Sequence, residues 1–490
     1  MKLTRRASFS YGIGGAPYAV KESAFTQFAL LFYTQVLGLS GTVTGVVLFI
    51  SLVWDAISDP LMGAWTDRFK SRWGRRHPFM AVSAIPLALG HVALFYPPQW
   101  VQTNSTALAI WLLVCSLWIR TWVTVFALPH LALAAEITQD YHQRSSLLGQ
   151  RIGFLFFTSI LLSALSMYWL FNEVDGQDGR FIADNYASFG WLSAVVILVT
   201  ASVCIYGTRG FIATTRIHAD RMPSGQGVRG IARDFMATIG NRSFRHLLCY
   251  DLGASASYGI IIALNILVWT YFWEFDATTM ALLMGLPVFT AVPLALFTTA
   301  KLGKYWPKHK ILKYAIFLML VDLVWIYPLR FLDILPANGH WLVMVLVFLQ
   351  NFIFVYLFVL RNIAAYSITA DLTDEHESNC GKRQEAGFYS TMAFTTKLAS
   401  GLGPLYAGLV LDFIGLQEGM MPGTIAQPVL DSLIWAMLLG ALPLMFMAWR
   451  FTLKVSMSKA QLQQIQATIL ASRASQPITD HPQNREKLKS

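Results

Sequence analysis

The chain has 490 residues, of which 55% are hydrophobic and only 13% are charged, and its formal net charge is +10. A soluble protein of this length needs far more charge to cover its surface, so this composition excludes an ordinary soluble globular protein. Apolar runs of about 20 residues, the length that a helix needs to cross hydrocarbon, recur along the whole sequence. They predict an all-α integral membrane protein in which the basic excess belongs to loops at the lipid bilayer and not to a nucleic-acid surface.

Twelve membrane-spanning helices are predicted in chain order. They cover residues 10–37, 42–64, 78–96, 106–135, 148–171, 188–207, 244–273, 279–300, 311–329, 341–368, 384–414 and 428–452. The first run is too long and too polar for a cleaved signal peptide, since it contains Lys21 and Glu22. Two polar stretches divide the chain into a six-helix bundle (1–207), a cytoplasmic connector (208–243), a second six-helix bundle (244–452) and a cytoplasmic tail (453–490) that is partly disordered.

Lysine and arginine gather in alternate loops. They lie after span two, in the connector and after span eight, whereas the loops between these are short and uncharged or acidic. Because cytoplasmic loops carry the excess of basic residues, both termini are predicted to face the cytoplasm. The stretches "GAWTDRFKSRWGRR" and "TAKLGKYWPKHK" follow spans two and eight, and this six-span period is typical of a transporter built from duplicated bundles.

Two aspartates inside span two predict a cation site. Asp55 and Asp59 are four residues apart, so they share a helical face with their Cβ atoms about 6 Å apart. Two such carboxylates repel each other unless a proton, a cation or a basic side chain lies between them, and oxygen ligands suit hard metal ions such as Na⁺. Thr124 in span four could add a hydroxyl oxygen. Lys397 in span eleven is the expected partner of the aspartates without the ion, and its displacement would couple ion occupancy to helix movement.

Arginines in the predicted spans give information on the charge of the substrate. Arg120, Thr124 and Ala127 follow one another at helical spacing and share a face of span four. A cavity lined by Arg120, Arg151 and Lys397 would favour an anionic group on the substrate. The alternative is that Arg120 lies near the membrane surface and reaches water.

A membrane enzyme is the alternative from a different functional class. The sequence contains no HExxH, no CxxC pair and no glycine-rich phosphate loop, so it offers no catalytic residue. His130 has no acidic partner at catalytic spacing and is interpreted as a packing or cavity residue. No cofactor is expected beyond a co-transported Na⁺, H⁺ or Li⁺, and the sequence does not distinguish these ions.

Four long stretches, in order along the chain, resemble one family. They are "SYGIGGAPYAV", "WDAISDPLMGAWTDRFKSRWGRRHPF", "LPHLALAAEITQDYHQRSSLLGQR" and "ITADLTDEHESNCGKRQEAGFYSTMAFTTKLASGLGPLYAGLVLDFIGL". Together they resemble the glycoside–pentoside–hexuronide:cation symporters, the melibiose permease family within the major facilitator superfamily. The resemblance implies two six-helix bundles with alternating access, cation-coupled uptake of a sugar or glycoside across the cytoplasmic (inner) membrane, and a monomer.

The resemblance also assigns residues. Asp55, Asp59 and Thr124 match the cation-site positions of the family, and Lys397 matches its lysine in span eleven. Allowing one gap, Arg151 matches an arginine implicated in substrate recognition.

The sugar-binding positions depart from the family pattern. Ala19 and Ala127 stand where the family has two aspartates that bind sugar hydroxyls. Tyr18 and Glu22, in the matching stretch of span one, are the candidate substrate-binding residues there, and Glu22 is a possible substitute for the carboxylate missing at Ala19. Loss of two anions, with Arg120 on the same face as Ala127, favours an anionic substrate such as a hexuronide over a neutral galactoside.

The loop after span two resembles the gating motif of the superfamily. Its candidate gating residues are Asp67, Arg68, Arg75 and Arg76, which could pair across the bundles at the cytoplasmic ends. The other interpretation, a basic loop that fixes topology, is compatible with this one.

A second branch of the family remains open. "YGIGGAPYAV" and "FTTKLASGLGPLYAGLVLDFIGL" also resemble the sodium-dependent lysophosphatidylcholine symporters of animals. A zwitterionic lipid headgroup could then use Arg151, and the acyl chain an apolar cleft. A sugar or glycoside is preferred because it is the commoner cargo of the family.

Overall fold

The computed structural model describes residues 4–69, 71–138, 140–174, 176–212, 238–380, 385–416 and 419–455, with the isolated positions 236, 461, 464, 465 and 467. Within these ranges every regular element is a helix and no strand forms. Eleven candidate spans in this part of the chain are long and apolar enough to cross a membrane. These observations confirm the predicted all-α membrane fold.

The helices follow the predicted spans closely. The first half contains α1 (Arg5–Ile13), α2 (Ala16–Ser23), η1 (Ala24–Phe28), α3 (Ala29–Leu31), η2 (Phe32–Val36), α4 (Gly41–Arg68), α5 (His77–Phe95), α6 (Gln99–Gln102), α7 (Ser105–Ile137), α8 (Tyr141–Trp169), η3 (Gly179–Phe181), α9 (Ala183–Thr208) and η4 (Arg209–Phe211). The second half contains α12 (Arg242–Leu267), η5 (Val268–Phe272), α13 (Ala277–Tyr305), α14 (Lys308–Val324), α15 (Ile326–Phe331), α16 (Trp341–Cys380), α17 (Glu385–Ser400), α18 (Leu402–Ile414) and α19 (Gln427–Thr452).

The first predicted span is a series of short helices from Arg5 to Val36. It is the predicted span that has no counterpart among the eleven long apolar helices. Its first break falls at Gly14 and Gly15. A Cβ atom on Gly14 would lie 2.5 Å from His130 Nε2, and one on Gly15 would lie 2.5 Å from the carbonyl oxygen of Arg151. Only glycine permits such close approach, so the break packs directly against α7 and α8.

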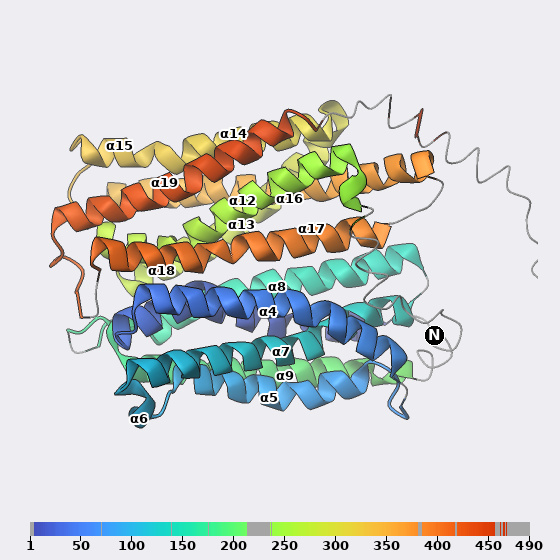
Figure 1. Cartoon of the computed structure of the whole chain (residues 1–490), viewed down its shortest axis with the longest axis horizontal. Coiled ribbons are helices and arrows are strands. Elements are labelled where there is room, and N and C mark those ends of the chain that lie inside the picture. Colours follow the sequence, from blue (N-terminus) through green and yellow to red (C-terminus); the bar gives the residue numbers. More distant parts are fainter. Residues whose placement is uncertain are drawn as a thin grey trace, which may run out of the picture.

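The helices form two groups that lie side by side (Figure 1). One group contains α4, α5, α7, α8 and α9, and the other contains α12 to α19. The groups meet where α4 packs against α18 and α8 packs against α13. A Cβ atom on Gly41 or Gly45 of α4 would come within 2.5 Å of the carbonyl oxygen of Gly408 or Pro404, respectively. These glycines therefore allow the two backbones to touch.

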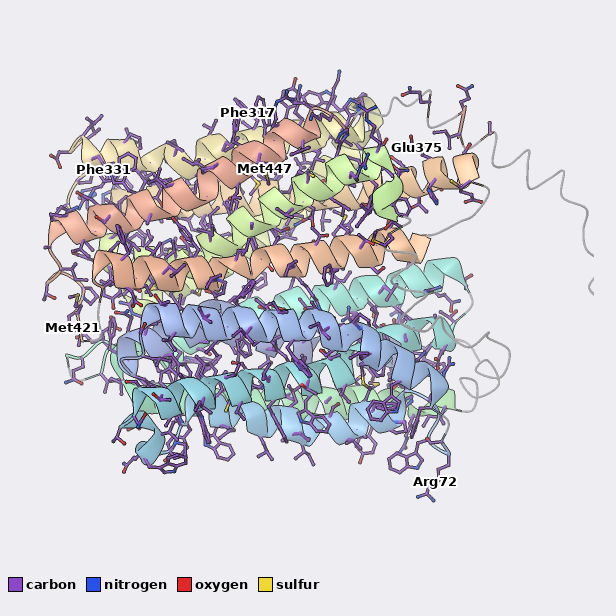
Figure 2. All side chains as sticks on the ribbon, viewed as in Figure 1. Arg72, Phe317, Phe331, Glu375, Met421 and Met447 are labelled. Carbon is purple, nitrogen blue, oxygen red and sulfur yellow. The ribbon has the colours of Figure 1, made fainter. Side chains whose placement is uncertain are left out.

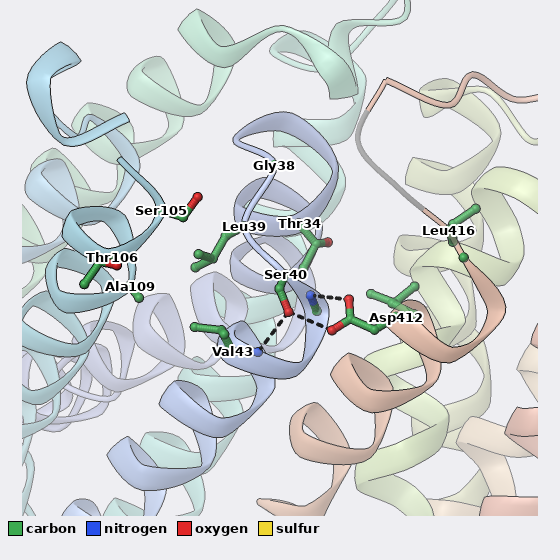
Figure 3. A pocket seen from close by; sticks show the side chains of 13 residues that line it. Thr34, Gly38, Leu39, Ser40, Val43, Ser105, Thr106, Ala109, Asp412 and Leu416 are labelled. Carbon is green, nitrogen blue, oxygen red and sulfur yellow. Dashed lines mark hydrogen bonds between the residues drawn. The ribbon is translucent and has the colours of Figure 1, made fainter. Parts of the chain in front are cut away.

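Asp412 of α18 caps the beginning of α4 from the other group (Figure 3). Its carboxylate accepts hydrogen bonds from Ser40 Oγ at 2.7 Å, from the Gly41 amide at 2.8 Å and from the Thr42 amide at 2.9 Å. A carboxylate at a helix N-terminus satisfies free amides and complements the helix dipole. A pocket of about 740 Å³ lies beside this contact. It contains neither Asp55 nor Asp59 and so does not mark the charged site described below.

Two further contacts join the groups at the same end of the molecule. Tyr271 donates a hydrogen bond from its hydroxyl to Gln35 Oε1 at 2.8 Å. The Arg180 guanidinium, from the loop between α8 and α9, donates to Thr270 Oγ1 at 3.0 Å. Together with Asp412, these contacts hold the two groups together at the end of the molecule where α4 begins.

Apolar side chains cover the outer surface of the bundle. Figure 2 shows Phe317 at the outside of α14, where 45% of its surface is exposed. Similar exposure of large apolar side chains on α5 and α13 suits helices that face lipid tails. Arg72 and Glu375 lie at one end of the bundle, whereas Met421 and Phe331 lie at the other.

Candidate functional site

The two aspartates of span two face a hydroxyl of span four. The Thr124 hydroxyl of α7 lies 3.2 Å from Asp55 Oδ1 and 2.9 Å from Asp59 Oδ1, both on α4. Three oxygen atoms from two helices of the first group therefore converge. Two carboxylates and a hydroxyl form a donor set suited to a small hard cation or a proton.

Lys397 of α17 reaches the same aspartates from the second group. Its ammonium contacts Asp59 Oδ2 directly and lies 3.5 Å from Asp55 Oδ2. Each carboxylate thus presents one oxygen to Thr124 and the other to Lys397. The ion pair that the sequence predicts between distant spans is present, and it joins the two groups of helices.

Arg120 lies inside the bundle beside Asp55. One guanidinium nitrogen is 3.4 Å from Asp55 Oδ2, and Nε donates a hydrogen bond to Ser51 Oγ at 2.8 Å. The guanidinium carbon lies 4.8 Å from the centre of the Phe25 ring, a distance typical of a cation–π contact. Only 3% of Arg120 is exposed, so it does not reach water at the membrane surface. Its guanidinium is paired with the Asp55 carboxylate.

Lys21 and Glu22 of α2 complete the group. The Lys21 ammonium lies 2.6 Å from Glu22 Oε1, 4.0 Å from Asp55 Oδ2 and 4.2 Å from the centre of the Tyr18 ring. In the sequence, Lys21 stands out only as a charged residue in an apolar run, and no role is predicted for it. Its position beside Glu22 was the available signal, but the contact with Asp55 depends on how α2 packs against α7, α8 and α9.

We call Lys21, Glu22, Asp55, Asp59, Arg120 and Lys397 the charged cluster. It contains three cations and three carboxylates, so its net charge is zero. The side chain of Asp55 is 2% exposed, whereas those of Asp59 and Lys397 are each 25% exposed. Burial explains why Asp55 needs three cationic neighbours, since an unpaired charge in a protein interior is costly. The ion pair of Asp59 and Lys397 is therefore partly exposed, as is Glu22 at 35%, whereas Asp55 is not.

Arg151 occupies a separate place. It lies on α8 against the Gly14–Gly15 break, and among the described residues no carboxylate oxygen comes within 4 Å of it. Its Nε atom is buried and has no hydrogen-bond partner in that part of the chain. The His130 ring nearby shares a hydrogen bond of 2.8 Å with the carbonyl oxygen of Tyr11, which gives it the packing role that the sequence suggested.

Two of the candidate gating residues, Arg75 and Arg76, contact Glu136 in their own half of the chain. Arg75 and Arg76 bind one oxygen of Glu136 at 2.7 and 2.8 Å, and Arg76 also donates to Thr66 Oγ1 at 2.9 Å. Glu136, near the end of α7, was missed by sequence reasoning. Pairing across the bundles was expected, whereas the contacts of these two arginines with Glu136 lie within the first half of the chain. The side chains of Asp67 and Arg68 lie outside the described part of the chain.

A matching ion pair lies six spans later. Lys308, at the beginning of α14, donates to both carboxylate oxygens of Asp371 on α16 at 2.8 Å. Arg75 and Arg76 precede span three and bind span four, just as Lys308 begins span nine and binds span ten. This correspondence supports the internal repeat that the two basic loops suggest.

Comparison with known proteins finds relatives over nearly the whole chain. The family model described as MFS/sugar transport protein matches residues 10–455. YagG of Escherichia coli (strain K12), a candidate glycoside/cation symporter, is 24% identical over 484 residues, which are 97% of each chain. Sodium-dependent lysophosphatidylcholine symporter 1-A of Danio rerio is 23% identical over 85% of this chain and 80% of its own length.

Solved structures show the same fold at low sequence identity. The xylose transporter XylE from E. coli, in an inward-open conformation, has a TM-score of 0.59 and 13% identity over 94% of this chain and 98% of its own. The nucleoside transporter NupG has a TM-score of 0.62 and 12% identity over 93% of this chain and 100% of its own. At this identity the likeness concerns the fold alone.

Proposed function

The chain belongs to the MFS/sugar transport protein family, and from this premise we propose that it is a secondary active transporter that couples Na⁺ or H⁺ entry to uptake of a sugar, glycoside or hexuronide. The observation that carries the proposal is the position of Lys397. Its ammonium, from one group of helices, sits against Asp55 and Asp59 of the other group. A cation that takes this position must break this ionic contact between the groups.

The neutrality of the charged cluster supplies the coupling. A cation held by Asp55, Asp59 and Thr124 adds one positive charge to a group whose charges already balance. Lys397 is then repelled, and the ion pair between the two groups of helices opens. Because a ligand shifts a conformational equilibrium by its differential affinity for the two states, this exchange can drive alternating access.

The basic loops support an orientation. Because they should face the cytoplasm, both termini lie there, and the beginning of α4 lies at the outer face of the cytoplasmic membrane. Asp412, Gln35 and Arg180 connect the two groups at that face. Asp59 and Lys397 are partly exposed while these contacts join the groups at the outer face, so we interpret the structure as an inward-facing conformation. We also propose that the protein is a monomer.

The substrate proposal depends on the arginines. Arg120 is paired with Asp55, so it is a poor candidate for a direct anion ligand in this conformation. Arg151 is the better candidate, because no described carboxylate compensates it. Ala19 and Ala127 place no carboxylate at the two sugar-binding positions of the melibiose permease pattern. An anionic sugar such as a hexuronide fits these residues better than a neutral galactoside.

A lysophospholipid is the second candidate cargo. It is supported by the likeness to a sodium-dependent lysophosphatidylcholine symporter of Danio rerio, and Arg151 could meet its phosphate. A membrane enzyme is not favoured, because the family is one of transport proteins.

A thermal-shift screen of the purified protein tests the proposal. Glycosides, glucuronides and lysophosphatidylcholine are each added with NaCl or with choline chloride. We expect stabilisation by a glucuronide or glycoside that is larger in Na⁺, since cargo and cation bind cooperatively in a symporter. A response to lysophosphatidylcholine alone would replace the sugar with the lipid. Stabilisation by a sugar that is the same in Na⁺, in choline and at lowered pH would contradict cation coupling.

A further inference from the structure

A second buried carboxylate lies close to Lys397 in the second group of helices. Asp251 on α12 is 5% exposed. It accepts hydrogen bonds from Thr396 Oγ1 at 2.7 Å and from Ser255 Oγ at 3.3 Å. Among the described residues, no basic side chain lies within 4 Å of it. Asp251 is therefore a buried carboxyl group held by hydroxyl groups, in a setting where ion pairing is the usual arrangement for a charged side chain.

The nearest cation on α16 is already engaged. Arg361 is 3% exposed and donates to the hydroxyl of Tyr250, the neighbour of Asp251, at 3.2 Å. Its guanidinium carbon lies 4.7 Å from the centre of the Phe358 ring. Arg361 thus places a positive charge near Asp251 while its own contacts are with Tyr250 and Phe358. Arg361 does not pair directly with the Asp251 carboxylate.

Thr396 connects this carboxylate to the cation site. It is the residue before Lys397 on α17, and its hydroxyl binds Asp251. The ammonium of Lys397 binds Asp59 on the opposite side of the interface. Adjacent residues of one helix therefore contact a carboxylate in each group of helices. Lysine carries its ammonium on a flexible four-carbon stem, which can take more than one direction from the same backbone position.

We propose that Asp251 is the positioning residue that receives the Lys397 ammonium when a cation occupies Asp55 and Asp59. This inference rests on the proposed function. A displaced ammonium still needs a counter-charge, because an isolated charge in low-dielectric surroundings is costly. Asp251 supplies it within the second group, so the cation turns an ion pair between the groups into one inside a single group. That change removes one ionic contact between the two groups.

Asp322 is a matched control for this role. It is a buried aspartate of the same group, with 3% of its surface exposed. Its carboxylate accepts a hydrogen bond from Trp325 Nε1 at 3.2 Å. It lies on α14, which packs against α16 and α19. Substitution of Asp322 therefore tests the general effect of removing a buried carboxylate from the second group.

The test measures the half-maximal NaCl concentration for thermal stabilisation of purified, full-length variants. We expect Asp251→Asn to raise it by about tenfold or more, equivalent to about 1.4 kcal/mol, because Lys397 then stays on Asp59. Asp251→Glu keeps the charge and should stay near the wild-type value. Asp322→Asn should leave the value unchanged. In a Lys397→Ala background, Asp251→Asn should have no further effect, since no ammonium remains to be received.

Several results would overturn the proposal. Equal Na⁺ responses of the wild type and Asp251→Asn would do so. An equal loss of Na⁺ response from Asp251→Asn with and without Lys397 would also overturn it, because Asp251 would then be a structural residue. If Asp251→Asn does not fold, Asp251→Glu and the isosteric Thr396→Val, compared with and without Lys397, decide the matter. A wild type that gains no stability from Na⁺, Li⁺ or lowered pH would contradict the proposed function itself, whereas a responsive wild type confines any failure to Asp251.

Discussion

Asp59→Asn is the substitution that probes the cation site most cleanly. Asparagine keeps the shape of the side chain and removes one negative charge. In the structure, Asp59 presents Oδ1 to Thr124 at 2.9 Å and Oδ2 to Lys397. The variant changes the charged cluster from neutral to a net positive charge. The loss of one carboxylate and the net positive charge of the cluster should both oppose the binding of a cation. Asp55 should stay paired with Arg120.

The size of the effect follows from the charge that is removed. Two unit charges 4 Å apart interact by about 4 kcal/mol at an effective dielectric constant of about 20. The side chain of Asp59 is 25% exposed, and solvent screening weakens such a contact. Halving the Coulomb value for screening leaves about 2 kcal/mol, which corresponds to an affinity about 30-fold weaker.

The assay is a NaCl titration of thermal stability at constant ionic strength, with choline as the replacement cation. Asp322→Asn, a buried aspartate remote from the cluster, is the control and should respond to Na⁺ like the wild type. If Asp59→Asn responds to Na⁺ within threefold of the wild-type concentration, the assignment of Asp59 as a cation ligand is wrong.

Arg120→Gln should lower the unfolding free energy by about 3 kcal/mol, because removal of one partner leaves Asp55 less compensated in a buried site; an unchanged Tm would contradict this role. Arg151→Gln, which breaks no described ion pair, should keep the Tm and weaken binding of a glucuronide but not of its neutral glucoside. Equal affinity for both sugars in wild type and variant would refute that. Asp412→Ala removes a helix cap worth about 1 kcal/mol at the end of the molecule that we propose to be the outer face. Labelling of Leu39→Cys by an impermeant maleimide should then rise about fivefold, and unchanged labelling would exclude Asp412 as a contact that keeps that face closed.

The spans could be predicted because hydrocarbon sets their length. The prediction of 42–64 for span two compares with α4 at Gly41–Arg68, since the apolar run marks the part inside the membrane. The prediction of 341–368 ended early, because α16 continues to Cys380 through polar residues. Hydropathy reports the membrane, whereas a helix can continue beyond it. The break at Gly14–Gly15 was not predicted, because it depends on close packing against α7 and α8.

The candidate site was partly predictable for a similar reason. Asp55 and Asp59 stood out because charge is rare in a span, and their spacing alone places them on one face. Lys397 was the expected cation from the other half, and the structure brings it to both aspartates. The contacts of Lys21 with Asp55 and of Thr396 with Asp251 could not be predicted. They depend on the rotation and depth of neighbouring helices, which a single sequence does not specify.

Uptake into proteoliposomes tests the central claim most directly. A labelled glucuronide is supplied outside, with an inward Na⁺ gradient, an inward proton gradient or no gradient. The account predicts that the wild type accumulates the sugar above its outside concentration only while a cation gradient exists. Asp59→Asn should exchange the sugar in counterflow and fail to concentrate it. Accumulation by Asp59→Asn at the wild-type level would contradict the account.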